Sequence, residues 1–107
     1  MNKMTQQVFE TLQTFKKQYE SDGVYIIGLF GSYAQGRNDA FSDIDIAYHL
    51  DHKLFSKKYK DGFSKILRLE EIKHSLEQLF RKKVDFVSLD SSNKSFLEHI
   101  KKEMLYV

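Results

Sequence analysis

The sequence feature that most limits the fold is a run of seven mostly apolar residues, Val24–Phe30. The run is rich in β-branched and aromatic side chains, which favour strands. The turn-forming residues Ser21-Asp22-Gly23 precede it, and Gly31-Ser32 follows it directly. Because apolar side chains occupy both odd and even positions, the run predicts a strand that is buried on both faces.

Two further stretches and the chain end also have the pattern of strands. Residues 43–50 begin with alternating acidic and apolar side chains, which is typical of a strand with one charged and one buried face. Residues 84–89 are predicted to form the next strand, and residues 104–107 a short closing one. One side of the strand at 84–89 carries Asp85, Val87 and Leu89.

Three stretches repeat apolar residues at the spacing of an amphipathic helix. The first spans about residues 3–20 and the second residues 63–80, while the third follows Ser91 or Ser92, either of which is positioned to cap it. Residues 36–42 and the lysine-rich residues 51–62 are predicted to be a loop and a surface segment. The helical stripes are Met4, Val8, Leu12, Phe15 and Tyr19; Phe63, Ile66, Leu69, Ile72, Leu76, Leu79 and Phe80; and Phe96, Leu97 and Ile100.

The order of these elements predicts the fold class. Helix, strand, strand, helix, strand and helix together indicate an α+β, or mixed α/β, fold in which a small mixed β-sheet packs against helices. A chain of 107 residues fits one domain, residues 1–107.

Composition excludes several kinds of function. The chain has no cysteine, so disulfides, thiolate metal sites and cysteine nucleophiles are absent. The formal net charge is only +2, which does not by itself indicate nucleic-acid binding. The N-terminal residues lack the apolar run of a signal peptide, and no stretch approaches the ~20 apolar residues that span a bilayer. We therefore expect a cytoplasmic location and no membrane contact.

Asp43 and Asp45 suggest a metal site. Residues two apart in a strand point to the same face, so these two carboxylates are expected to stand side by side. Divalent cations relieve the repulsion between such groups, and magnesium prefers carboxylate and phosphate oxygens. A solvated strand edge with two surface aspartates is the alternative that an isolated Asp-x-Asp leaves open.

Gly31-Ser32 and Asp85 are the other candidate site residues. A glycine at the end of a buried strand lets a phosphate approach the backbone, and a serine at a helix start can bind phosphate oxygens. Gly36 is either a second close-approach point or a loop glycine, and the Gly-Ser pair alone also fits an ordinary turn. Asp85 is unusual in a strand, and a salt bridge with Lys82 or Lys83 is its simplest alternative explanation.

The combined motif resembles a known family. Gly31-Ser32-Tyr33-Ala34-Gln35-Gly36, continuing to Ser42-Asp43-Ile44-Asp45 with a third aspartate on a later strand, resembles the signature of the DNA polymerase β-like nucleotidyltransferase superfamily. The chain length and the final Met104-Leu105-Tyr106 resemble its minimal nucleotidyltransferase (MNT) branch. The resemblance implies the polymerase β-like nucleotidyltransferase fold.

The resemblance also implies a chemistry. In such a site Asp43 and Asp45 hold two Mg²⁺ ions, while Asp85 shares one ion and helps to activate the attacking hydroxyl. Gly31 and Ser32 bind the β- and γ-phosphates of ATP, and pyrophosphate leaves as the hydroxyl attacks the α-phosphorus. MNT relatives often carry arginine where this chain has Gln35. Arg37 is then either a substitute contact for the triphosphate, beside Gly36, or a solvated loop residue.

The resemblance finally suggests a partner. Antibiotic-modifying, polymerase and tRNA-tailing members carry further domains, whereas this sequence ends soon after the third aspartate. A bare MNT domain resembles the antitoxin of HEPN/MNT toxin–antitoxin pairs, which adenylylates a tyrosine of a helical HEPN RNase. A non-catalytic binding module that neutralises its partner by contact is the alternative, and an RNA-binding protein is a third. His49, His52, His74 and His99 lack the spacing of a helical metal site. His49 and His52 flank a strand end and are expected to be surface residues instead of zinc ligands.

Overall fold

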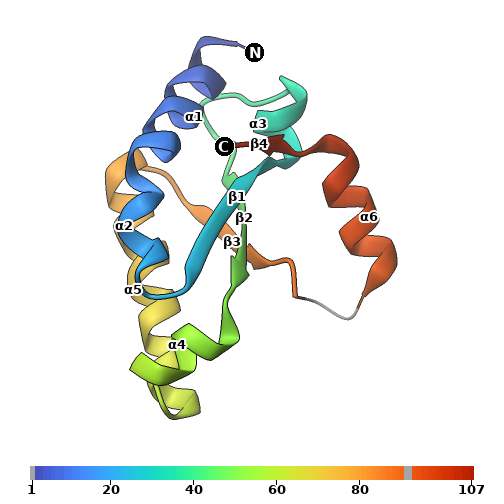
Figure 1. The fold of residues 1–107 in the computed structure, drawn as a ribbon. Coiled ribbons are helices and arrows are strands. Elements are labelled where there is room, and N and C mark those ends of the chain that lie inside the picture. The colour runs from blue at the N-terminus through green and yellow to red at the C-terminus, as the bar shows by residue number, and fades with distance from the viewer. Residues whose placement is uncertain (1, 91–92) are drawn as a thin grey trace.

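The computed structural model describes residues 2–90 and 93–107 and contains a mixed sheet with helices on both of its faces (Figure 1). Strand order in the sheet is β3-β2-β1-β4. Strand β1 is antiparallel to both β2 and β4, whereas β2 and β3 run parallel. The elements are α1 (Lys3–Phe15), α2 (Lys17–Glu20), β1 (Val24–Phe30), α3 (Gly31–Gln35), β2 (Ile44–Leu50), α4 (His52–Lys58), α5 (Gly62–Phe80), β3 (Val84–Ser88), α6 (Lys94–Glu103) and β4 (Leu105–Tyr106).

The two faces of the sheet are covered unequally. Helices α1, α2, α4 and α5 pack on one face, where alternate strand residues such as Ile44 and Ile46 are fully buried. On the other face α6 contributes to a smaller cluster, through Ile100 packed near Ala47. Figure 1 shows α6 standing apart from the other long helices. This thinly covered face leaves room for polar side chains of β2 and β3.

Several helices begin at a polar side chain that caps their free backbone amides. Asn2 accepts from the Thr5 amide at 2.8 Å and starts α1, and Asp61 accepts from the Ser64 amide at 2.7 Å and starts α5. Asn93 caps α6 through the Phe96 amide at 3.1 Å. Ser91 and Ser92, the predicted caps of this helix, lie outside the described residues.

Most predicted elements are confirmed. Strand β1 has the predicted bounds, although Tyr25 and Ile27 are only half-buried because the second face is thinly covered. The helix predicted over residues 3–20 is interrupted at Lys16, which separates α1 from α2. Strand β2 begins at Ile44, so Asp43 lies just before it. The α+β fold class with a small mixed sheet is correct.

Two predictions were wrong. The segment at 51–62 is not simply a surface segment, because it contains α4, which Asp51 caps and which Phe55 anchors in the core at 1% exposure. The stripe of α5 is not all core. Phe63 is 76% exposed and Ile66 is 66% exposed, whereas Ile72 and Leu76 are fully buried. The first turns of α5 lie near α4, away from the strands (Figure 1).

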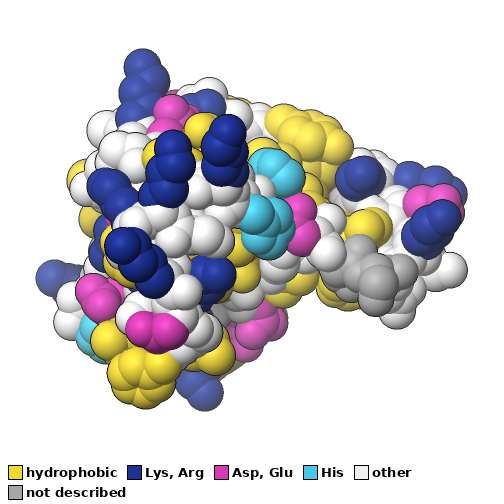
Figure 2. Space-filling view, turned by 60° about the horizontal axis from the view of Figure 1, so that its bottom comes forward, with side chains coloured by type: hydrophobic (Ala, Val, Ile, Leu, Met, Phe, Trp, Pro, Cys, Tyr) yellow, Lys and Arg dark blue, Asp and Glu magenta, His cyan; other side chains and the backbone are white. Residues whose placement is uncertain are grey.

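The surface around α4 carries many of the basic side chains. Figure 2 shows lysine and arginine side chains gathered on the face that includes this end of the molecule, with hydrophobic groups at its margins. Lys58 on α4 is not merely solvated, since its Nζ lies 2.7 Å from the carboxylate of Asp22. No helix in the described ranges is long and apolar enough to cross a membrane.

Candidate active site

Asp45 and Asp85 stand side by side on the thinly covered face of the sheet. They are direct register partners on the parallel strands β2 and β3. Asp45 is half-buried, and Asp85 is exposed. Burial, the hydrogen bond and charge of Asp85, and the charges of Asp43 and Glu103 raise the pKa of Asp45 to about 6. The pair therefore holds concentrated negative charge at neutral pH.

No cation of the protein neutralises this pair within the described ranges. None of the ion pairs there includes Asp43, Asp45 or Asp85. Because no ion pair joins Asp85 to Lys82 or Lys83 among the described residues, the salt-bridge explanation of Asp85 is wrong. The Lys82 ammonium instead donates to the Ala40 carbonyl at 2.6 Å. The repulsion is left for an external cation to relieve.

The structure gives Gly31 a role that the sequence did not suggest. Gly31 has φ +70°, and a Cβ atom there would overlap the Oδ2 atom of Asp45. Phe30, the preceding residue, is the register partner of Asp45 on β1. Glycine is thus required because the carboxylate already occupies the space beside the backbone. The Gly-Ser turn and the acidic pair form one local structure.

Ser32 lies in the first turn of α3, half-buried, and the described part of the chain provides no hydrogen-bond partner for its hydroxyl. That hydroxyl is therefore available to a ligand. Gly36 ends α3 in the left-handed conformation with φ +72°, and no atom would lie within 4 Å of a Cβ there. Backbone conformation, not close approach within the protein, explains this glycine.

Arg37 lies in the loop after α3, and its guanidinium donates a hydrogen bond to the side-chain carbonyl of Gln35. It forms no ion pair with any carboxylate of the described residues. The next residue fastens the loop to α1, since Asn38 Oδ1 accepts from Asn2 at 2.6 Å and from the Thr5 hydroxyl at 3.2 Å. The loop thus presents an unneutralised cation from an anchored position.

Glu103 is a site residue that sequence reasoning missed. It ends α6, and its side chain is 12% exposed. Its Oε1 atom accepts the Gly31 amide at 2.9 Å, and its Oε2 atom accepts the side-chain amide of Gln35. No spacing rule connects a glutamate to a glycine 72 residues earlier, so the sequence held no signal for this contact.

The acidic residues were tested as a metal site. Among residues 2–90 and 93–107, no three histidine or acidic side chains are spaced so that they could hold a metal ion by themselves. Magnesium, however, commonly uses only one or two carboxylates and completes its shell with waters and substrate phosphates. The unneutralised pair of Asp45 and Asp85, with Asp43 near enough to act on it by charge, fits that requirement.

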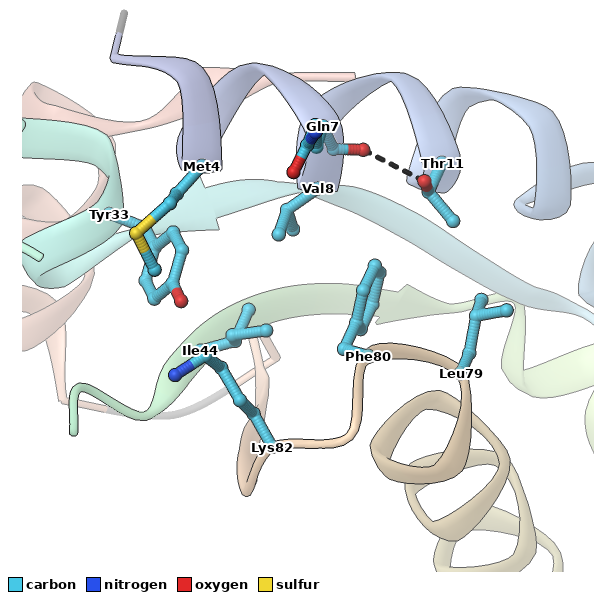
Figure 3. A pocket seen from close by; sticks show the side chains of 9 residues that line it. All are labelled: Met4, Gln7, Val8, Thr11, Tyr33, Ile44, Leu79, Phe80 and Lys82. Atoms are coloured by element: carbon cyan, nitrogen blue, oxygen red, sulfur yellow. Dashed lines mark hydrogen bonds between the residues drawn. The ribbon is translucent and has the colours of Figure 1, made fainter. Parts of the chain in front are cut away.

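A separate cavity lies on the opposite face of the sheet. A cavity of about 240 Å³ on the helix-covered face is lined by residues that include Tyr33, Ile44 and Lys82, and by none of the three aspartates. Figure 3 shows Tyr33 and Met4 on one side of it and Phe80 on the other, below α1. The cavity is mostly apolar and faces away from Asp45, because Ile44 and Asp45 point to opposite faces.

The histidines lie outside the acidic pair, and His49 and His52 are on the surface, as predicted. His49 and His52 are exposed and both approach the carboxylate of Asp90, at 2.9 and 3.5 Å. His99 is also exposed, and its Nε2 atom lies 4.0 Å from Glu103. None of these contacts involves Asp43, Asp45 or Asp85.

Sequence comparison identifies relatives of the same length. The family profile described as "Polymerase beta, Nucleotidyltransferase" matches residues 10–107. A candidate protein adenylyltransferase of Methanocaldococcus jannaschii, MJ1379, is 32% identical over 107 residues, covering 98% of this chain and 99% of the relative. Protein adenylyltransferase MntA of Thermococcus cleftensis is 28% identical over 109 residues, covering 100% of both chains.

Solved structures share the fold. A candidate minimal nucleotidyltransferase superposes with a TM-score of 0.65 at 22% identity, covering 92% of this chain and 95% of that one. A toxin–antitoxin structure with AMP-PNP superposes with a TM-score of 0.60 at 25% identity, covering 84% of this chain and 66% of that one. Because the family profile spans most of the chain and the Gly-Ser turn adjoins the paired aspartates, this protein belongs to the polymerase beta nucleotidyltransferase family.

Proposed function

We propose that this nucleotidyltransferase transfers AMP from ATP to a hydroxyl of a partner protein, acting as a single domain over residues 1–107. The observation that carries the proposal is the unneutralised pair of Asp45 and Asp85 against the Gly31 turn. An acidic pair repels a triphosphate unless cations lie between them. The arrangement therefore suits a reaction in which nucleotide and metal bind together.

Asp43, Asp45 and Asp85 are the proposed metal-binding and catalytic residues, for two Mg²⁺ ions. When bound, the ions supply charge stabilisation at the attacking and leaving oxygens. Asp85, exposed at the outer strand β3, accepts the proton of the attacking hydroxyl. As that oxygen bonds to the α-phosphorus, the bond to the bridging oxygen breaks and pyrophosphate leaves.

Gly31, Ser32, Gly36 and Arg37 are the proposed nucleotide-binding residues. The Ser32 hydroxyl lacks a protein partner within the described ranges and lies on the helix turn beside Asp45. Arg37 provides a cation without a carboxylate partner there, and Gly36 turns the chain so that Arg37 follows α3 directly. The charge of Arg37 and the Ser32 hydroxyl support phosphate binding at the rim of the acidic site.

The proposed acceptor is a tyrosine of a HEPN-family RNase, so that the protein is the antitoxin of a toxin–antitoxin pair. Support comes from the relative named protein adenylyltransferase MntA and from the similar toxin–antitoxin structure with AMP-PNP. A partner protein would also complete the thinly covered face of the sheet and position the hydroxyl. Attachment of AMP would add a bulky anion beside an RNA-binding site and repel the RNA backbone.

The rival proposal is a binding module that neutralises its partner by contact. The absence of a preformed three-ligand metal site among the described residues favours it. The experiment is co-expression with the product of the adjacent gene, followed by intact mass measurement of that partner. Added AMP with the wild-type chain, and none with Asp43→Asn, supports transfer. Neutralisation by Asp43→Asn without added mass would establish the binding module instead.

A further inference from the structure

Glu103 is an acidic residue placed next to other acids, which is unfavourable unless it has a specific task. Its charge adds to those of Asp85 and Asp43 in acting on Asp45. Its side chain is largely enclosed, at 12% exposure, and both of its oxygens are hydrogen-bonded. A neutral residue at the end of α6 would avoid this repulsion. The task must therefore lie in the two groups that Glu103 holds.

The first group is the backbone of the Gly-Ser turn. Glu103 Oε1 accepts the Gly31 amide at 2.9 Å, which fixes the turn at the place where β1 becomes α3. The second group is Gln35 at the other end of α3, whose amide nitrogen donates to Glu103 Oε2. One carboxylate thus spans the whole of α3 from its first residue to its last.

The side-chain amide of Gln35 connects Glu103 to Arg37. Its side-chain carbonyl accepts the Arg37 guanidinium, while its NH₂ group faces Glu103. An amide has one donor end and one acceptor end, so its orientation is fixed by having a carboxylate on one side and a guanidinium on the other. The chain of contacts from Gly31 through Glu103 and Gln35 to Arg37 is hereafter called the relay.

We propose that Glu103 and Gln35 are positioning residues that hold Arg37 at the rim of the acidic site, where it binds the triphosphate of the nucleotide. The inference rests on the proposed function, since it assumes that ATP binds beside Asp45. The Arg37 amide donates to the Ser32 carbonyl at 2.9 Å, so Arg37 starts beside the Gly-Ser turn. In the complex the relay fixes the direction from which its guanidinium meets the phosphates. An arginine at position 35 is then unnecessary, because Gln35 directs the arginine two residues on.

A competing explanation makes the opposite prediction. If Glu103 instead occupied the Gly31 amide as a stand-in for a phosphate oxygen, ATP would have to displace it. Removing the charge of Glu103 would then tighten ATP binding. Under the proposal the same change loosens ATP binding, so the sign of the effect separates the two.

The order of hydrogen-bond donors and acceptors along the relay provides a test. In Glu103→Gln, one end of the new amide can still accept the Gly31 amide, but its NH₂ group then meets the NH₂ group of Gln35. Rotating Gln35 only moves the conflict to Arg37. Gln35→Glu places two carboxylates against each other instead. Combining both changes restores one carboxylate, one amide and the same total charge, with every donor again facing an acceptor.

The measurement is the Kd of ATP in Mg²⁺ by calorimetry on the full chain, with KM and kcat for AMP transfer as a second readout. Each single variant should weaken ATP binding about 5- to 20-fold and raise KM more than it lowers kcat. The double variant should return to within about 3-fold of wild type. Arg37→Ala should weaken binding to the same extent as the single variants, and adding Gln35→Glu to it should cost little more.

Controls separate failure of the inference from failure of the proposed function. Glu98→Gln, an exposed change on the same helix, should leave ATP binding as in wild type, and urea unfolding should verify that each variant is folded. Tighter ATP binding by Glu103→Gln, or a double variant as weak as the two losses combined, would overturn the relay. If wild type itself binds no ATP in Mg²⁺, the proposed function fails first.

Discussion

Two enclosed aspartates in this protein have opposite surroundings. Asp22, at the turn before β1, is 6% exposed and contacts Lys58 at 2.7 Å, Arg68 at 2.8 Å and the Tyr59 hydroxyl at 3.1 Å. Burial alone would raise the pKa of Asp22, but these hydrogen bonds outweigh it and hold that pKa below its usual value. Asp45, at the site, has acids around it and a pKa raised to about 6.

The comparison shows that the chain can neutralise a buried acid and does not do so at Asp45. Two cations and a hydroxyl surround Asp22, whose role is to tie α4 and α5 to the start of β1. Among the described residues no ion pair includes Asp45, and the Arg37 guanidinium is bonded to Gln35. Uncompensated charge is therefore a local property of the site. Substitution of Asp22 should lower stability and spare activity, whereas substitution of Asp45 should abolish activity and raise stability.

The largest expected effect is on catalysis. Asp45→Asn should lower AMP transfer by about 1,000-fold or more, because under the proposed function it removes a carboxylate of the metal site. The measurement is incorporation of label from α-labelled ATP into the partner protein. Asp22→Asn, corrected for its folded fraction, should transfer AMP at close to the wild-type rate. Comparable losses in both variants would show that the contrast between the two aspartates has no functional meaning.

The next effect is on stability at Asp22. Asp22→Asn should lower the free energy of unfolding by about 2–3 kcal/mol, because the Arg68 guanidinium and the Lys58 ammonium lose their shared counter-charge. Urea unfolding at neutral pH measures this change. Glu98→Gln is the matched control at an exposed position and should change stability by less than about 0.5 kcal/mol. If Asp22→Asn lowered the free energy of unfolding no more than Glu98→Gln does, the contacts of Asp22 with Lys58 and Arg68 would contribute nothing to stability.

The sequence singled out Asp45 as a candidate site residue, but it did not indicate that Asp22 would be the centre of a group of ion pairs. The resemblance to the nucleotidyltransferase family implied that Asp85 would share a metal site with Asp45 near Gly31, and the register of β2 and β3 places the two aspartates side by side there. Asp22 looked like an ordinary turn residue, because its partners arrive from 36 and 46 residues later. Periodicity reports which face a residue is on. It does not report which distant side chain will meet it there.

The same limit explains the remaining errors. Helix α4 was missed because a single buried residue, Phe55, anchors it among polar neighbours, which gives no repeating stripe. Phe63 fits the stripe of α5 but lies on turns that no strand covers. Glu103 follows two lysines at the end of α6, as solvated residues commonly do. Only the folded chain brings it to Gly31.

A third effect is the opposite stability response at Asp45. Asp45→Asn should raise the free energy of unfolding by about 1–2 kcal/mol at pH 7, because it removes a charge that burial and repulsion from Asp85 disfavour. The pKa of Asp45 is raised on folding, so its ionisation destabilises the protein as pH rises from about 4 to about 6. The gain in Asp45→Asn should therefore vanish near pH 4. For Asp22, whose pKa is lowered, the stabilising contribution is present above about pH 4 and declines as pH falls further.

Denaturant unfolding of wild type, Asp45→Asn and Asp22→Asn across pH 4 to 8 would display these responses. The difference between wild type and Asp45→Asn should widen as pH rises, whereas the difference between wild type and Asp22→Asn should narrow as pH falls. If the free energies of unfolding of all three proteins changed with pH in parallel, both the raised pKa of Asp45 and the lowered pKa of Asp22 would be contradicted.

The smallest effect concerns the metal, and it separates the two regions most directly. If Mg²⁺ binds at the acidic pair, as proposed, it should stabilise wild type by about 1 kcal/mol at a concentration several-fold above its Kd. Asp45→Asn should respond much less, because half of the acidic pair is gone, while Asp22→Asn should respond like wild type. Thermal unfolding with Mg²⁺, compared with Na⁺ at equal ionic strength, separates binding from general screening. Equal stabilisation of all three proteins would place the ion away from Asp45. Because waters can take the place of substrate phosphates around the ion, this response can be measured without nucleotide or partner, and it tests the contribution of the acidic pair alone.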